Sequence, residues 1–195
     1  NWERKELPTH MPDHIKMNIV SWSPEQTQKK KKELDTLKEV TEDLQIFLMN
    51  VEALSTKRGL EEADKFLFTH RTMLAVDEST TIKSRTAQRT KNLIKLGKNA
   101  PYRRILTGSP VTKSPLDLFT QCEFLEHYVL GQGSFWTFQN RYAKMLRRTM
   151  GAHSFNQIVG YQNLDELNGI IEPFSYRVRK EDCLDLPEKV YTRRT

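Results

Sequence analysis

Two adjacent acids, Asp77 and Glu78, directly follow an apolar run, residues 72–76, that has the length of a buried strand. Open α/β sheets bind ligands at the carboxyl ends of their strands, so the pair is expected at a ligand-binding edge. Neighbouring strand residues point to opposite sides. One carboxylate can therefore hold a magnesium ion through water while the other polarises an attacking water, as phosphoryl transfer to water requires. The alternative is a pair of solvated loop acids, which these two residues alone do not exclude.

A second polar turn, Thr107-Gly108-Ser109-Pro110, follows another predicted strand, residues 102–106. If both runs are strands of one parallel sheet, this turn lies on the same edge as the acids. Two hydroxyls beside two carboxylates would suit a sensor of bound phosphate. An ordinary strand-exit turn is the alternative, because Gly, Ser and Pro are common there.

A phosphate-binding loop would complete such a site. It needs the pattern Gly-x-x-x-x-Gly-Lys-Ser/Thr, so that backbone amides cradle the phosphates and the lysine reaches them. The single Gly-Lys pair, Gly97-Lys98, is followed by Asn99 and does not follow a predicted strand. We therefore expect these 195 residues to hydrolyse no ATP on their own.

The elements that must position these residues alternate between strand-like and helix-like segments. Long helical connections imply parallel strands with crossovers, and hence an α/β fold. Ser23 is the expected N-cap of the first helix, with Gln26 closing a capping box, and Gly97 is expected to end a later helix. The predicted strands are residues 15–20, 44–49, 72–76 and 102–106, and the predicted helices are residues 23–38, 60–69 and 85–96.

From residue 114 to about residue 175 the pattern becomes mainly helical. Ser114-Pro115 and Asn163 mark expected helix starts. Gly131-Gln132-Gly133 separates two expected helices.

The composition is that of one ordinary globular domain, with 37% hydrophobic and 29% charged residues. No apolar run approaches the roughly 20 residues needed to cross a bilayer, and the first residues do not resemble a secretory leader. Cys122 and Cys183 are too few for a disulfide framework, so reduced thiols and a cytoplasmic location are expected.

Positive charge is concentrated in one stretch. The chain carries a net charge of +6 and has no acidic residue between Glu78 and Asp117. A one-sign stretch favours contact with nucleic acid over a merely soluble surface. By contrast, the run Lys29-Lys30-Lys31-Lys32 is followed at once by Glu33 and is interpreted as a solvated helix face. The basic residues of the acid-free stretch are Lys83, Arg85, Arg89, Lys91, Lys95, Lys98, Arg103, Arg104 and Lys113.

The histidines give a weaker signal. His10 and His14 are four residues apart, a spacing that can bind a metal on one helix face. Pro12 between them argues against such a helix, so we do not predict a metal site there.

Four blocks in this order resemble the Snf-type ATPases of helicase superfamily two, over nearly the whole chain. Asn1-Trp2 resembles the segment after that family's motif Ia, and residues 47–54 resemble its motif Ib region. Asp77-Glu78-Ser79-Thr80 is similar to motif II, and Leu106-Thr107-Gly108-Ser109-Pro110 to motif III. Residues 116–125 and 138–142 resemble the helical protrusion after motif III, and residues 177–189 the basic passage towards a second lobe.

The sequence departs from the family pattern at three places. Thr80 stands where His is commoner in motif II, and Ser109 where Thr is commoner in motif III. Val51 stands where the motif Ib region usually has an aromatic residue. Compact phage-encoded members are the most similar in character, which would place the protein in a host cytoplasm.

The resemblance implies a RecA-like parallel sheet flanked by helices, incomplete because the P-loop strand is absent, with a helical insertion after motif III. Residues 1–113 would form the partial first lobe, residues 114–175 the helical protrusion, and residues 176–195 the segment leading towards the second lobe. In this family the P-loop lies upstream of motif Ia, and the second lobe supplies arginine fingers.

The resemblance also implies site residues and partners. Asp77 would bind Mg²⁺ through water and Glu78 would be the general base, while Thr107, Gly108 and Ser109 would couple the ATP state to DNA. The implied partners are ATP, double-stranded DNA and a second RecA-like lobe of the same protein. The predicted DNA-binding residues, taken with the basic stretch, are Asn50, Glu52, Lys83, Arg85, Arg89 and Arg177.

Two other functions are compatible with parts of the sequence. A basic module could hold DNA without turnover. A magnesium-dependent nuclease could be built on Asp77 and Glu78, but the sequence shows none of the further acids, Lys or His that two-metal sites gather nearby.

Overall fold

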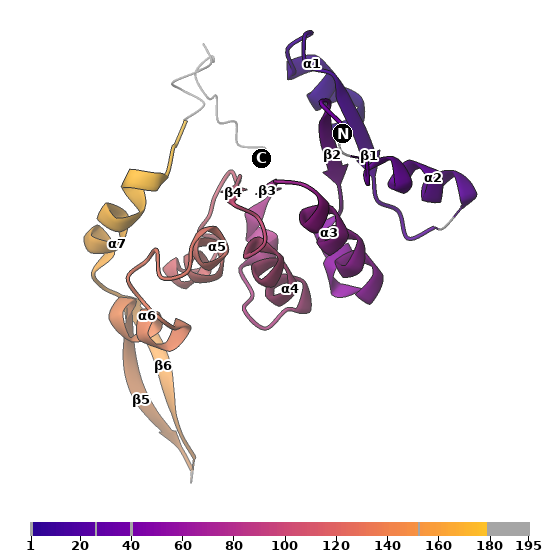
Figure 1. Ribbon diagram of the computed structural model, residues 1–195. Coiled ribbons are helices and arrows are strands. Elements are labelled where there is room, and N and C mark those ends of the chain that lie inside the picture. The colour runs from indigo at the N-terminus through magenta and orange to yellow at the C-terminus, as the bar shows by residue number, and fades with distance from the viewer. Residues whose placement is uncertain (1, 26, 40, 152, 179–195) are drawn as a thin grey trace, which may run out of the picture.

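The computed structural model describes residues 2–25, 27–39, 41–151 and 153–178. It is an α/β chain with parallel strand pairs, as predicted, followed by an arm that carries a long hairpin (Figure 1). The passage over residues 179–189 and Cys183 lie outside the described residues.

The first strand pair lies in the N-terminal part. A short π-helix, η1 (Trp2–Glu6), and α1 (Leu7–His10) precede β1 (Met17–Ser21), which pairs in parallel with β2 (Leu44–Leu48). The crossover helix between them is α2 (Gln28–Thr36). Both predicted strands are confirmed to within two residues at either end.

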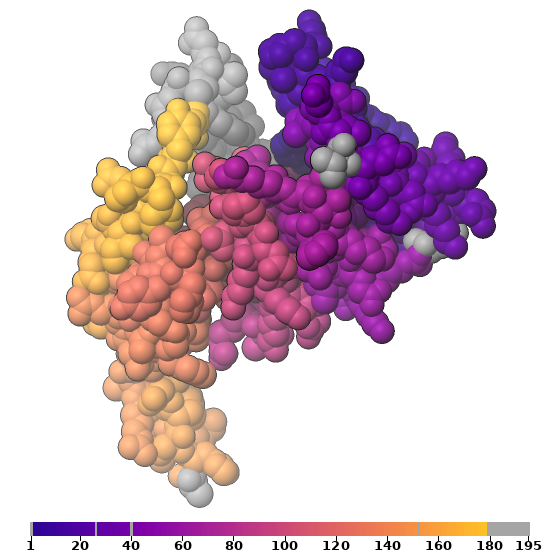
Figure 2. Space-filling view, viewed as in Figure 1, coloured from indigo at the N-terminus to yellow at the C-terminus, as the bar shows by residue number. Residues whose placement is uncertain are grey.

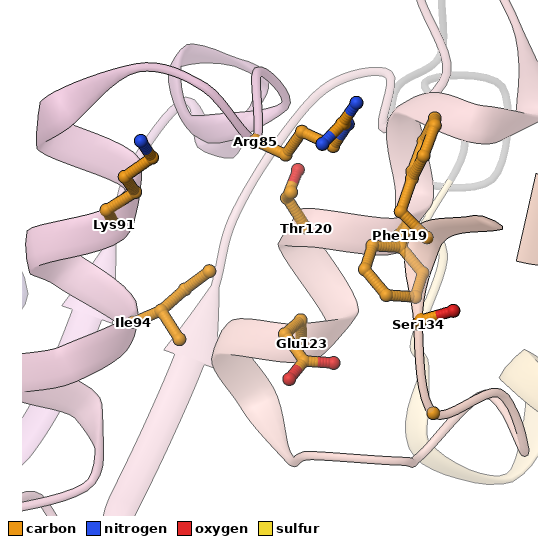
Figure 3. Close-up of a pocket in the computed structure, with 9 residues that line it drawn as sticks. Arg85, Lys91, Ile94, Phe119, Thr120, Glu123 and Ser134 are labelled. Atoms are coloured by element: carbon orange, nitrogen blue, oxygen red, sulfur yellow. The ribbon is translucent and has the colours of Figure 1, made fainter.

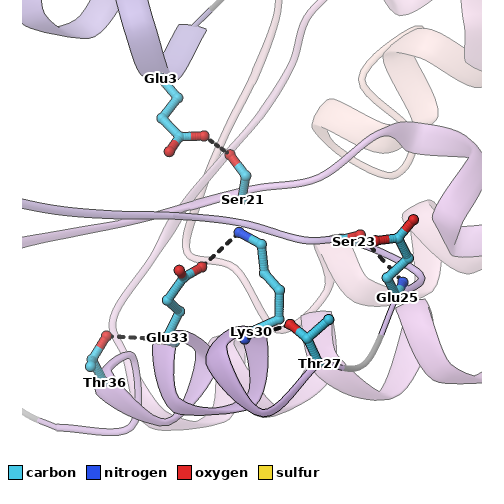
Figure 4. Close-up of polar contacts among 8 residues, drawn as sticks. All are labelled: Glu3, Ser21, Ser23, Glu25, Thr27, Lys30, Glu33 and Thr36. Carbon is cyan, nitrogen blue, oxygen red and sulfur yellow. Dashed lines mark hydrogen bonds and ion pairs between the residues drawn. The ribbon is translucent and has the colours of Figure 1, made fainter.

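The start of α2 corrects the capping prediction. Thr27, not Ser23, is the N-cap, and its side chain accepts a hydrogen bond from the Lys30 backbone (Figure 4). Ser23 instead accepts one from the Glu25 backbone at 3.3 Å, in a turn before the helix. Pro24 fits that turn as well as it would fit a first helical turn, so the sequence alone did not separate the two.

The second strand pair carries the predicted site. β3 (Met73–Val76) pairs in parallel with β4 (Tyr102–Ile105), and α4 (Gln88–Gly97) is the crossover helix. Two 3-10 helices, η2 (Val51–Ser55) and η3 (Ser79–Ile82), and the helix α3 (Lys57–Thr69) complete this part. Within the described ranges the two parallel pairs are separate sheets.

A first core forms where α3, α4 and β3 meet. Leu67, Val76, Leu93 and Leu96 are buried there together with Phe124 from a later helix. Gly97 is the last residue of α4, and a Cβ added to it would lie 3.2 Å from the Phe124 ring. The glycine therefore allows a close approach between the helices.

The segment after β4 corrects the mainly helical prediction. It begins with helices, η4 (Pro115–Asp117), α5 (Leu118–Leu125) and α6 (Phe135–Tyr142), and ends with α7 (Leu164–Ile171) and the 3-10 turn η5 (Glu172–Phe174). Between α6 and α7, however, β5 (Ala143–Met150) and β6 (His153–Tyr161) form an antiparallel hairpin.

The residues of β5 explain why the strand was missed. Its sequence, AKMLRRTM, consists mostly of good helix formers. Pairing with β6 overrides that local preference, and Gly151, with φ of +61°, supplies the turn between the strands.

A second core holds the base of this segment, and α5 belongs to both cores. Phe119 and Cys122 of α5 pack with Phe138, Tyr142 and Leu167, whereas Phe124 packs in the first core. Figure 2 shows no gap between the part of the molecule that contains β3, β4 and α4 and the part that contains α6. Burial raises the pKa of the Cys122 thiol to about 12, so this side chain acts as an apolar filler and not as a nucleophile.

Candidate active site

The ends of β3 and β4 bring the two predicted motifs to one edge. Val76 and Ile105 are register partners in the parallel pair, so the residues that follow each strand leave the sheet on the same side. The backbone ladder continues past the strands, since Leu106 N–H donates to Val76 O at 2.8 Å and Ser79 N–H donates to Leu106 O at 3.0 Å. The acids and the Thr107-Gly108-Ser109-Pro110 turn are therefore neighbours.

Asp77 is exposed but held by two donors. Its Oδ1 accepts from the Glu78 backbone N–H at 3.0 Å, and its Oδ2 accepts from Trp2 Nε1 at 2.9 Å. Trp2 is 75 residues away in sequence, and it fixes the direction of the Asp77 carboxylate. The sequence analysis placed Trp2 only in the segment after motif Ia and gave it no part in the site.

Glu78 has a strained backbone. Its φ of 49° and ψ of 57° lie in the left-handed region, which costs a non-glycine residue roughly 1–2 kcal/mol. Such strain persists where the surroundings over-determine the conformation, and it is concentrated at functional sites. Here Ser79 on one side and Asp77 on the other are both fixed by hydrogen bonds.

The motif III turn is closed by its own hydroxyls. Thr107 Oγ1 accepts from Ser109 N–H at 3.2 Å, and Ser109 Oγ donates to Val111 O at 2.9 Å. A Cβ at Gly108 would meet no atom within 4 Å, so nothing in this conformation of the protein requires glycine there.

Gln121 of α5 links the two motifs, and the sequence analysis missed it. Its side chain is fully buried. Its Oε1 accepts from the buried Ser79 hydroxyl at 2.6 Å, and its Nε2 donates to Pro110 O at 2.8 Å and to Asp117 O at 2.7 Å. The one signal in the sequence was an amide in the middle of an apolar helix.

Asp117 stabilises the loop that follows motif III. Its Oδ2 accepts from the backbone N–H groups of Thr112 and Lys113, at 3.0 and 2.9 Å, and from the Thr112 hydroxyl at 2.8 Å. Partial burial by itself would raise the pKa of this carboxyl, but these hydrogen bonds outweigh it and hold the pKa below its ordinary value. The Asp117 charge therefore keeps the loop closed at neutral pH.

Three of the predicted DNA-binding residues lie together and bind one another. Asn50 caps η2 by accepting from the Glu52 backbone at 3.0 Å. The Glu52 carboxylate pairs with Arg89 at 3.0 Å, and Arg89 Nε donates to Thr81 O at 3.0 Å. This contact ties the motif Ib region to the residues that follow motif II.

The other three predicted DNA-binding residues lie apart. Lys83 donates to the Thr112 hydroxyl, and the Arg85 guanidinium lies over the Phe135 and Trp136 rings, 4.7 and 4.9 Å from their centroids. Arg177 is exposed after η5, and no described hydrogen bond or ion pair joins it to the other five.

Several lysines of the basic stretch are exposed and form no ion pair within the described ranges. They are Lys91, Lys95, Lys98 and Lys113. One of them, Lys91, lies with Arg85 at the edge of a cavity of about 360 Å³ between α4 and α5 (Figure 3). Neither Asp77 nor Glu78 lines this cavity, so it is separate from the candidate active site.

Neither a metal cluster nor a membrane segment is found in the described part of the chain. No three or more His, Cys, Asp or Glu side chains gather there in a way that would hold a metal ion. None of its helices has both the length and the apolar character of a transmembrane span.

Comparison with known proteins places this site in context. The chain matches the family model of the SNF2-related domain over residues 1–194. It is similar to a SWI/SNF-related subfamily A-like protein 1 homologue from Caenorhabditis elegans, with 31% identity over 95% of this chain and 24% of the relative. The DNA annealing helicase and endonuclease ZRANB3 of Bos taurus is 33% identical over 62% of this chain and 11% of its own length. The chain thus spans at most about a quarter of these relatives.

A solved structure of the same family has a similar fold. The Sulfolobus solfataricus SWI2/SNF2 ATPase core, determined in complex with double-stranded DNA, superposes with a TM-score of 0.60 at 25% sequence identity. The match covers 93% of this chain and 32% of that one.

Proposed function

Because the chain belongs to the SNF2-related domain family of superfamily two ATPases, we propose that it is part of the motor of a DNA-dependent ATPase that translocates on double-stranded DNA. The observation that carries the proposal is the shared edge of β3 and β4, where two acids and a hydroxyl-bearing turn are joined through the backbone. Turnover needs a P-loop and a second RecA-like lobe in addition to these residues. The predicted affiliation with phage-encoded members stays a prediction.

Asp77 fits the magnesium ion that accompanies ATP in such enzymes. Each of its carboxylate oxygens accepts one hydrogen bond and keeps a lone pair free. Mg²⁺ usually keeps several waters and takes one or two protein carboxylates besides substrate phosphates, so a single oriented carboxylate suits it. The ion, bound with ATP, would neutralise phosphate charge. Trp2 and the Glu78 backbone hold the Asp77 carboxylate in place for this role.

Glu78 is the proposed general base. It is exposed at the strand edge, on a backbone whose strained conformation is fixed from both sides. It would take the proton from the water that attacks the terminal phosphate. A fixed backbone lowers the cost of orienting the carboxylate for that transfer.

The state of the nucleotide is proposed to pass through Thr107 and Ser109 to α5. A shift of their turn would move Pro110, whose carbonyl is bound to Gln121. Gln121 also holds Ser79, next to the proposed base. The buried amide therefore makes the two motifs move as one unit.

The simplest test is the response of ATP hydrolysis to DNA. We expect the full-length protein to hydrolyse ATP faster when blunt double-stranded DNA is added, because DNA contact completes the active arrangement of the motor. Steady-state phosphate release with and without DNA measures this. Salt-sensitive DNA binding without any turnover would instead support the basic binding module.

DNA affinity should fall steeply with salt. The logarithm of the binding constant falls with that of the salt concentration in proportion to the number of phosphates contacted. With about three phosphate contacts, raising salt from about 50 to about 200 mM would weaken binding roughly 40-fold. Fluorescence anisotropy with labelled duplexes of two unrelated sequences measures the slope, and the two slopes should agree because phosphate contacts carry no sequence information. A flat salt response would contradict the assignment of the basic stretch to DNA.

A further inference from the structure

The β5–β6 hairpin extends away from both cores. In Figure 1 it leaves α6 and ends far from the rest of the chain, and Figure 2 shows its distal half surrounded by solvent. Its base is anchored, since Ala143 is buried and Ile158 and Tyr161 pack on the second core. Towards the turn every described residue is exposed: Leu146–Met150 on one strand and 153–157 on the other. The base packs on the second core, whereas the distal half buries no side chain and so adds little to the stability of the core. We infer that the distal half serves to contact a partner.

The charge of this region has one sign. The sequence contains no acidic residue between Glu126 and Asp165. The hairpin itself carries Lys144, Arg147 and Arg148. In the described part of the chain none of the three forms an ion pair, and Arg148 donates a hydrogen bond to the Gln157 side chain at 3.0 Å. The charges are therefore available to an anionic partner.

One face of the distal hairpin combines Arg148 with exposed apolar groups. Alternate strand residues share a face, and the register pairs Arg148 with Phe155 and Met150 with His153. On this face Leu146 is 44% exposed, Phe155 49% and Met150 71%. The opposite face is polar, with Arg147 paired to Asn156 and Thr149 to Ser154.

Exposed apolar groups beside cations fit one kind of nucleic acid in particular. A fully paired duplex presents mainly phosphates on its outside, so it would use the cations and leave the apolar face in water. Unpaired nucleotides present both phosphates and the faces of their bases, and bases stack on aromatic side chains. An acidic protein surface would also pair with the cations. It would have no planar base to stack on the Phe155 ring, which lies between Arg148 and Met150.

We propose that the β5–β6 hairpin binds unpaired DNA next to the duplex on which the motor acts, with Phe155 stacking on a base and Arg148, on the same face, contacting a phosphate. This inference rests on the proposed function, in that DNA is the partner. It adds a second DNA surface, separate from the basic stretch of residues 79–116. This surface would give a preference for junctions between paired and unpaired DNA, which the shared edge of β3 and β4 does not supply.

The test compares two DNAs in the full-length protein. One is a blunt duplex and the other is the same duplex with a single-stranded tail, both labelled for anisotropy. We expect Phe155→Ala to weaken binding to the tailed duplex about tenfold, in line with the loss of one stacked base. Its affinity for the blunt duplex, and the ATP hydrolysis that blunt duplex stimulates, should stay within about twofold of wild type.

Matched controls are present in the chain. Phe68 is 94% exposed on α3, against 49% for Phe155, so Phe68→Ala removes an even more exposed ring from a different place. For the charge, Arg148→Ala is compared with Lys31→Ala, which removes the same charge from the exposed face of α2. All of these side chains are exposed, so thermal unfolding should be unchanged in each variant.

The outcomes separate this inference from the proposed function. Failure of the wild-type protein to respond to blunt duplex overturns the proposed function. A wild-type response together with no effect of Phe155→Ala on the tailed duplex overturns the hairpin proposal. Equal weakening for both DNAs also overturns it, because the hairpin would then contact paired DNA. Lost ATP hydrolysis with unchanged DNA binding would mean that the hairpin packs against protein, and overturns it too.

Discussion

Glu78→Gln is expected to reduce the DNA-stimulated ATP hydrolysis of the full-length protein by about 10²–10⁴-fold, the usual contribution of a general base. Glutamine keeps the shape of the side chain but cannot accept a proton at neutral pH. The side chain is exposed, and both residues carry the same backbone penalty at a φ of 49°, so stability should not change. Phosphate release under saturating ATP and duplex measures the effect.

The control for this variant is Glu42→Gln, because Glu42 is also exposed and forms no ion pair within the described residues. DNA binding by the Glu78→Gln protein should match wild type, which separates loss of chemistry from loss of the partner. Hydrolysis that stays within tenfold of wild type would contradict the general-base role and leave Glu78 as a strained surface acid.

Gln121→Leu is expected to lower the free energy of unfolding by about 1–3 kcal/mol, the cost of leaving a buried polar group without its partner. Leucine is similar in size, so the space in α5 stays filled, but the buried Ser79 hydroxyl loses its acceptor and Pro110 loses a donor. Denaturant unfolding measures the loss. The stimulation of ATP hydrolysis by DNA, as a ratio to the basal rate, should also fall, because the two motifs are no longer joined.

A double-mutant cycle shows whether the link itself is responsible. Ser79→Ala removes the other partner, so Ser79→Ala/Gln121→Leu should be less destabilised than the sum of the two single variants. A purely additive result would show that Ser79 and Gln121 do not act together. An unchanged stimulation ratio in a destabilised Gln121→Leu protein would confine the residue to packing.

The parallel strand pairs could be predicted because local signals and topology agree there. Apolar runs of strand length alternate with amphipathic helices, and a helical crossover leaves parallel pairing as the simple solution. The positions of Asp77 and Thr107 followed from this, since Asp77 comes directly after β3 and Thr107 lies two residues beyond the end of β4.

The contacts that complete the site could not be predicted in the same way. Trp2 binds Asp77 across 75 residues, and Gln121 binds Ser79 across 42. No spacing rule reaches so far, because such pairs are set by how the elements pack and not by any periodicity. Arg89 is a further case, since the fold pairs it with Glu52, while its predicted contact with DNA stays a prediction.

The placement of α5 in both cores constrains how this protein can evolve. An inserted segment that is connected to a domain only through loops can be replaced as a unit during evolution. Here the first turns after β4 cannot be exchanged freely, because Phe124 packs in the first core and Gln121 joins Ser79 to the turn after β4. Among the described residues after α5, none packs in the first core. We therefore expect relatives to differ more in the hairpin and α7 than on the face of α5 that carries Gln121 and Phe124, so that the proposed DNA preference of the hairpin can change without altering the proposed active site.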